Sequence, residues 1–168
     1  ISRIGGASMT MLNSSVVTYG DTGYGLFVSG TGAVLDASNT RVATEGANAS
    51  AVAISNRALL KLDGVDLRTS GADARGIWSY MTVVGATNAP TMTGGSISTQ
   101  DGAALLASGG DHAFTLKDVN VIGRSGGQEA GGLFLQTLPL SVSSGGVTTV
   151  IETGVAQLGA QRSRLTGD

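Results

Sequence analysis

The feature that most constrains this chain is a repeat of about 25 residues, which is written five times. Each copy centres on an aliphatic residue, which is usually followed two positions later by Thr and then by a Gly-bearing turn. Successive anchors lie 26, 25, 30 and 24 residues apart, at Val16, Val42, Leu67, Ile97 and Val121. A fixed period of this length with short strand-like runs is typical of a solenoid, in which similar units stack on one another.

Each copy carries apolar residues at two positions upstream of its anchor, separated by a polar or small residue. These pairs are Met9 and Met11, Leu35 and Ala37, Leu60 and Leu62, Pro90 and Met92, and Phe114 and Leu116. Alternation of this kind predicts a strand with one buried face. Three residues before the anchors stand Asn13, Asn39, Gly64, Gly94 and Asp118. Because these residue types tolerate a left-handed backbone, we expect a sharp corner between two strands there.

A third strand follows each anchor, as in Gly25-Leu26-Phe27-Val28, and its second and fourth residues are mostly aliphatic. Three short strands per copy, without a helical pattern, predict a right-handed parallel β-helix with three-strand coils of about 25 residues. We expect these coils over residues 1–150, interrupted by insertions near 80–89 and 136–147 that leave the solenoid as loops. Residues 151–168 are expected to be irregular or a further coil, with Ile151 as a possible sixth anchor. The absence of a polar cap near residue 1 indicates an excerpt of a longer solenoid.

Composition excludes several functional classes. The chain has no Cys, so disulfides and thiolate metal or redox sites are impossible. A net charge of −2 without a basic cluster argues against a nucleic-acid partner. No apolar run approaches the ~20 residues of a membrane-spanning helix.

Candidate catalytic groups are few. The single histidine, His112, follows Gly109-Gly110-Asp111, and this turn-like setting predicts a solvated side chain. Asp36 and Lys61 occupy matching positions on successive copies, which predicts a surface ion pair. Polysaccharide lyases and hydrolases need clustered carboxylates or an acid–base pair, and the supply on one face is poor. We therefore predict no enzymatic activity, no catalytic or metal site and no cofactor.

One column of residues does suggest a binding surface. The third position of each third strand should face outward, and it holds Phe27, Ala53, Trp78, Leu106 and Phe134. Tyr80 and Met81 follow closely after Trp78. Exposed apolar stripes mark contacts, and Trp is a favoured anchor residue. We expect Phe27, Trp78, Tyr80, Met81, Leu106 and Phe134 to contact a partner. Two alternatives remain open: other parts of the protein cover this column, or a register shifted by one residue buries it.

The recurring text Gly30-Thr31-Gly32-Ala33-Val34-Leu35 and Ala58-Leu59-Leu60-Lys61-Leu62-Asp63, together with the anchors and third strands, resembles the passenger domains of bacterial autotransporters (type V secretion) of the pertactin-like kind. The resemblance covers residues 5–135. It implies secretion through the outer membrane by a C-terminal β-barrel translocator that is not part of this chain, and display on the bacterial cell surface or release. The integrin-binding tripeptide Arg-Gly-Asp of that family is absent, since Arg75-Gly76 is followed by Ile77.

What the resemblance implies about function is adhesion or immune evasion by a virulence factor. The expected partner is a host extracellular, serum or cell-surface protein. Two alternatives stay open: a carbohydrate-active β-helix enzyme (lyase or hydrolase) whose site lies outside this segment, and a purely structural stalk.

Overall fold

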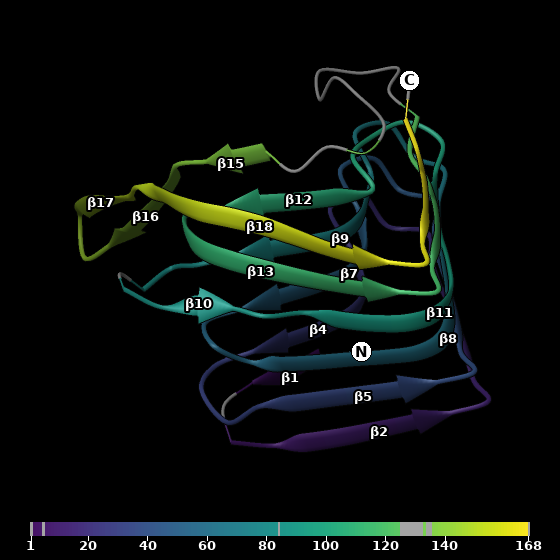
Figure 1. Cartoon of the computed structure of the whole chain (residues 1–168). Helices are drawn as coiled ribbons and strands as arrows, with labels where there is room; N and C mark the ends of the chain where they lie inside the picture. The colour runs from purple at the N-terminus through teal and green to yellow at the C-terminus, as the bar shows by residue number, and fades with distance from the viewer. Residues whose placement is uncertain (1, 5, 84, 125–132, 134–135, 168) are drawn as a thin grey trace.

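A computed structural model describes all residues of the chain except 1, 5, 84, 125–132, 134–135 and 168. Its described elements are all β-strands, which wind into a parallel solenoid with a front sheet, a side face and a back sheet (Figure 1). The chain runs along the front sheet to the right, turns through the side face and returns along the back sheet while it rises, which makes the solenoid right-handed (Figure 1). The fold class predicted from the repeat is therefore confirmed.

The three faces are built by strands from successive copies. The back sheet contains β1 (Ser2–Ile4), β4 (Tyr24–Ser29), β7 (Ser50–Ser55), β9 (Arg75–Tyr80), β12 (Leu105–Ser108) and β15 (Gln136–Leu138). The front sheet contains β2 (Ser8–Leu12), β5 (Val34–Ser38), β8 (Leu59–Thr69), β11 (Thr91–Thr99), β13 (Gly110–Lys117), β18 (Thr153–Gln161) and the short β10 (Thr87–Asn88). The side face contains β3 (Ser15–Thr18), β6 (Arg41–Thr44), the second halves of β8 and β11, β14 (Asn120–Ile122) and β19 (Arg164–Thr166).

The predicted corner between the front sheet and the side face is present in every copy. All five residues at this position have left-handed φ angles: Asn13 48°, Asn39 47°, Gly64 59°, Gly94 65° and Asp118 57°. An L side chain costs about 1–2 kcal/mol in this region, and Asn, Asp and Gly are the residues that adopt it most readily. The corner therefore explains why these residue types recur here.

The glycine in the turn after the anchor is required because the coils stack closely, and its φ angle is not the reason. A Cβ on Gly46 would overlap the carbonyl oxygen of Gly20, and a Cβ on Gly71 would overlap the carbonyl oxygen of Gly46. Both obstacles are backbone atoms, which cannot move aside as a side chain can. Glycine at this position thus sets the close approach of one coil to the next.

The core fills the solenoid interior with the residues that the repeat predicts. The aliphatic anchors Val42, Leu67, Ile97 and Val121 are at most 1% exposed. The front-strand pairs pack against them, as do the inward residues of the back strands, such as Leu26 and Val28. Threonines after the later anchors complete the next turn, since the Thr69 hydroxyl donates to the Ala74 carbonyl and the Thr99 hydroxyl to the Gly102 carbonyl.

The C-terminal segment is a sixth copy of the repeat, with its anchor at Leu165 rather than Ile151. β18 continues the front sheet beside β13, and β19 pairs with β14 so that Leu165 lies opposite Val121. Leu158 and Ala160 take the two upstream apolar positions, and Arg162 has the left-handed corner angle of 49°.

The two predicted insertions differ in structure. The insertion after Tyr80 folds back onto the solenoid, where β10 pairs with β13 and the Asn88 side chain is fully buried. The other extends to Ile151 and contains the antiparallel hairpin of β16 (Leu140–Ser144) and β17 (Val147–Ile151), which projects from the left end of the solenoid (Figure 1). Gly145 and Gly146 form its two-residue turn with φ angles of 58° and 78°. No helix within the described ranges is long and apolar enough to cross a membrane.

Candidate functional site: an aromatic surface on the back sheet

The predicted outward column exists in the expected register. Phe27 pairs with Ala53, Ala53 with Trp78, and Trp78 with Leu106. The next residue in this register is Gln136, which lies opposite Leu106. Phe134, which we expected at that level, lies outside the described residues. The register is therefore confirmed from Phe27 to Leu106, and Gln136 takes the position that follows Leu106.

The column is not a continuous exposed stripe. Phe27 and Trp78 are partly exposed, whereas Ala53 is 0% and Leu106 2% exposed. Met81 is also 0% exposed, because it leaves the sheet after Tyr80 and packs beneath Gly110. The expectation that Leu106 and Met81 present free surface is therefore wrong, and the exposed part of the column lies at the lower coils.

The structure adds a fourth ring, Tyr24, to this surface. Its ring centroid lies 5.2 Å from that of Phe27 and 6.1 Å from that of Trp78. Tyr80 completes the group, with centroid distances of 4.5 Å to Trp78 and 6.4 Å to Phe27. Because Ala53 lies in register between Phe27 and Trp78, the four rings converge over it, which explains its burial. We call Tyr24, Phe27, Trp78 and Tyr80 the aromatic surface.

Polar groups orient the rings of the aromatic surface. The Trp78 indole Nε1–H donates at 3.0 Å to the hydroxyl of Ser108 on the next coil, in which Leu106 is the register partner of Trp78. The Arg75 guanidinium lies 5.2 Å from the indole centroid, within cation–π range. Such contacts fix a large apolar area in one geometry while the rings stay partly exposed.

Both phenols of the aromatic surface remain protonated well above neutral pH. Burial raises the pKa of Tyr24, and the nearby Tyr80 phenol raises it further, against a lowering by Arg75. Burial also raises the pKa of Tyr80, against a lowering by its hydrogen bonds with Ser55 and Tyr24. At neutral pH the surface therefore carries two neutral hydroxyls and the positive charge of Arg75.

Tyr24 was missed because sequence reasoning compared only one position of each back strand. In the register, Tyr24 lies opposite Ser50, and Ser50 lies opposite Arg75. Reading this second position down the copies gives Tyr, Ser and Arg, a polar series that does not suggest an apolar column. Only the direction of the ring toward Phe27 brings Tyr24 into the aromatic surface.

His112 is not the solvated turn histidine that the sequence suggested. It is 1% exposed and lies in the solenoid interior, on the same face of β13 as Phe114 and Leu116. Its Nδ1 is 2.8 Å from the Ser79 hydroxyl and its Nε2 is 2.6 Å from the Gly109 carbonyl oxygen. Burial is the main cause that lowers its pKa, against opposing effects of the Gly109 carbonyl and Asp111.

Asn88 completes this buried network. Its Nδ2 donates to the Ser79 hydroxyl at 3.1 Å and to the Tyr80 carbonyl at 2.9 Å. Its Oδ1 accepts the backbone N–H of Arg57 at 2.9 Å. A serine and a histidine in contact could suggest a nucleophile and base, but both are sealed from solvent here. We assign the network to holding the insertion after Tyr80 on the solenoid.

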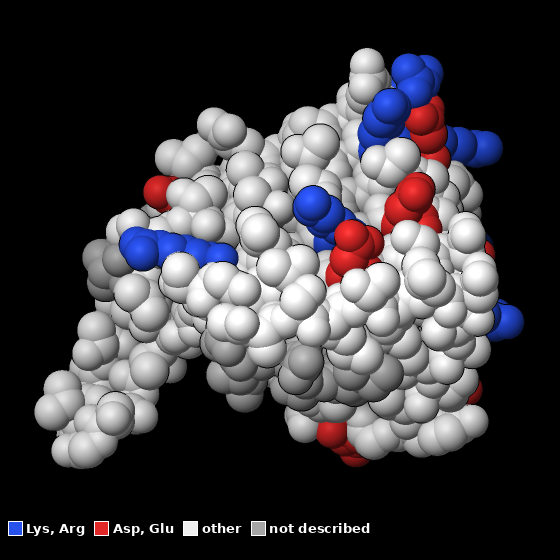
Figure 2. Space-filling view, turned by 90° about the horizontal axis from the view of Figure 1, so that it is seen from below, with Lys and Arg blue, Asp and Glu red and all other residues white. Residues whose placement is uncertain are grey.

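Charged groups do not assemble into a catalytic or metal site within the described part of the chain. No three His, Asp or Glu side chains there lie close enough to hold a metal ion. Asp36 and Lys61 are register partners as expected, but their charged atoms do not approach within ion-pair distance. An ion pair does form between Arg162 and Asp118, at 2.6 Å, at the corner of the sixth copy. Figure 2 shows charged side chains dispersed singly or in small groups over a mostly uncharged lower face.

Comparisons with known proteins add no assignment: no family model, curated protein or solved structure matches this chain. The class of molecule that the fold defines is an all-β parallel solenoid.

Proposed function

We propose that this chain is a binding segment of a secreted or surface-displayed bacterial protein, and that its aromatic surface contacts a protein partner without catalysis. The observation that carries the proposal is the convergence of four partly exposed rings, with Arg75 beside them, on the outer face of the back sheet. Tyr, Trp and Arg are the residues that most often dominate binding energy at protein interfaces.

The arrangement suits a protein partner because the rings are held in place before binding. Trp78 is fixed by its bond to Ser108, and Tyr24 and Tyr80 contact each other. Fixed side chains lose little conformational entropy when a partner binds, which favours affinity. The polar rim needed around an apolar contact is supplied by the phenol hydroxyls and Arg75.

The solenoid supports display at a distance. Its stacked coils form a stiff rod, and the chain can be exported without any thiol to oxidise, since it has no Cys. Together with the passenger-like repeat text, this supports an autotransporter passenger that acts as an adhesin or immune-evasion factor by binding a host protein. We propose the bacterial surface, or the medium after release, as its location.

The main alternative is a structural stalk, which the burial of Ala53 and Leu106 favours. In a stalk, the rings would serve only to cover the back sheet. The two functions differ in whether partner binding weakens when one of the rings is removed.

A capture experiment separates the two functions. The immobilised full chain is incubated with serum and with host-cell surface proteins, beside the variants Trp78→Ala and Tyr19→Ala. Tyr19 is the matched control, because it is 71% exposed and its ring is not part of the aromatic surface. The proposal predicts saturable capture of a defined protein, weakened at least about tenfold in Trp78→Ala and unchanged in Tyr19→Ala. No capture, or equal capture by all three folded proteins, would favour the stalk.

A further inference from the structure

The side face of the solenoid carries a second feature, a row of arginines on its outer surface. Arg41 on β6, Arg68 on β8, Arg124 after β14 and Arg164 on β19 are all exposed. They line adjoining hollows, the largest of about 570 Å³, whose described lining residues include one carboxylate, Asp66. A positive strip of this kind is unexpected on a chain whose net charge is −2.

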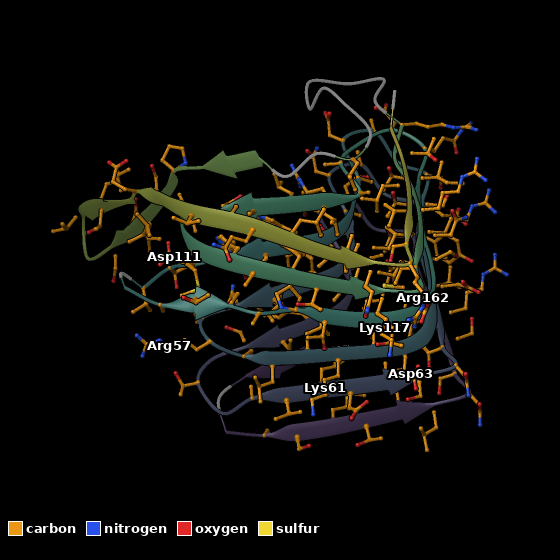
Figure 3. The ribbon with its side chains drawn as sticks, in the orientation of Figure 1. Arg57, Lys61, Asp63, Asp111, Lys117 and Arg162 are labelled. Carbon is orange, nitrogen blue, oxygen red and sulfur yellow. The ribbon has the colours of Figure 1, made fainter. Side chains whose placement is uncertain are left out.

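Stacking places two of the arginines at the ends of one outward column. One outward column of the side face runs from Arg41 through Asp66, Ser96 and Asn120 to Arg164, each residue in register with the next. With about 4.8 Å between neighbouring strands, the ends of this column are about 19 Å apart. Arg68 lies on the next outward column along the strand. Figure 3 shows long nitrogen-tipped side chains projecting from this right-hand edge of the solenoid.

The rest of the strip offers neutral hydrogen-bonding groups. Ser98 and Gln100 line the largest hollow, and Ser96 donates its hydroxyl to Asp66 Oδ1 at 2.6 Å. Aromatic side chains do not occur among the described residues that line the three hollows. Binding of single-stranded nucleic acid depends on aromatic stacking as well as charge, so this strip suits a non-aromatic polyanion better.

We propose that the side face binds a carboxylated polysaccharide, a polyuronate, which lies along the solenoid axis. Arginine forks pair with carboxylates through two parallel N–H···O bonds, so each arginine can hold one uronate group. A polyuronate carries one carboxylate per sugar, so a chain along the axis can present carboxylates to the neighbouring coils of Arg41 and Arg68 and, beyond the coil of β11, to those of Arg124 and Arg164. Ser98 and Gln100 bond the sugar hydroxyls, and Asp66 accepts from a hydroxyl between the arginines. This site is separate from the aromatic surface, and its test does not depend on the protein-binding proposal.

The test measures binding of polygalacturonate to the full chain by affinity electrophoresis and titration calorimetry. Fully methyl-esterified polygalacturonate, heparin and single-stranded DNA serve as comparison ligands. The variant Arg68→Gln with Arg124→Gln removes two charges from the strip. The matched control, Arg57→Gln with Lys61→Gln, removes two charges from positions on the left end and the front sheet (Figure 3). Thermal melting confirms that both variants fold.

Polygalacturonate binding should weaken about tenfold for each arginine removed from the strip and remain unchanged in the control. It should also weaken with added salt and be lost with the esterified polymer, which carries no carboxylates. Absence of polygalacturonate binding, an equal loss in both double variants, or binding of heparin or DNA in preference to polygalacturonate would overturn the proposal.

Discussion

Alanine in place of Gly71 tests the stacking of the coils against a control from the same repeat position. A Cβ on Gly71 overlaps the Gly46 carbonyl oxygen, whereas a Cβ on Gly20 meets no heavy atom within 4 Å. Neither glycine has a left-handed φ angle, so the two substitutions differ in the space available rather than in backbone strain. Gly71→Ala must displace one coil relative to the next, at a cost of about 1–3 kcal/mol. Gly20→Ala should leave stability unchanged or raise it slightly, because alanine restricts the unfolded chain.

Thermal unfolding of the full chain by far-UV circular dichroism measures this difference. For a chain of this size, 1 kcal/mol shifts Tm by about 2–4 °C. Gly71→Ala should therefore melt about 2–12 °C below the wild type, and Gly20→Ala within a degree or two of it. Equal melting temperatures for the two variants would refute the inference that these glycines stack on neighbouring coils.

Two further predictions concern the interior. Because burial lowers the pKa of His112, the unfolded chain takes up its proton first, so stability is complete above about pH 6.5 and falls as the pH drops below it. His112→Leu should flatten this pH dependence in denaturant titrations between pH 8 and pH 5. At pH 8 the substitution should lower the free energy of unfolding by about 1–3 kcal/mol, because it leaves the Gly109 carbonyl unpaired. If stability still falls as steeply with acid in the variant, another group causes the pH dependence. Leu60→Ala should cost about 2–5 kcal/mol, since Leu60 is 1% exposed, whereas Leu12→Ala, at 61% exposed, should cost little in the same titration. Similar losses at both positions would contradict the assigned inward face of the front strands.

Much of the fold could be predicted from sequence because equivalent positions of successive copies lie next to one another in a stacked solenoid. Once the anchors were aligned, the corner residues and the inward faces followed, and all five expected corners have left-handed φ angles. The anchor of the sixth copy was sought at Ile151 because the hairpin of β16 and β17 places the true anchor, Leu165, 44 residues after Val121. A search for the short upstream pattern, Leu158-x-Ala160, would have found it without a fixed period.

The candidate sites were harder to predict because they depend on side-chain direction. His112 was assigned to solvent from its turn-like neighbours, although its alternation with Phe114 and Leu116 places it on the inward face of β13. Leu106 was assigned correctly to the outer column, but it is only 2% exposed, and the indole of its register partner Trp78 bonds to Ser108 on the same strand. A repeat fixes which residues are neighbours in the register, and it does not fix which of them are covered by the longest side chains nearby.

Oxidative footprinting tests the central claim, that the aromatic surface is the contact surface for a protein partner. Hydroxyl radicals label exposed aromatic side chains, so their reaction with Trp78, Tyr80 and Tyr19 can be followed in one experiment on the full chain. When the captured partner is added, the account predicts reduced oxidation of Trp78 and Tyr80 and unchanged oxidation of Tyr19. Unchanged oxidation of Trp78 and Tyr80 in the complex, with protection elsewhere on the chain, would contradict it.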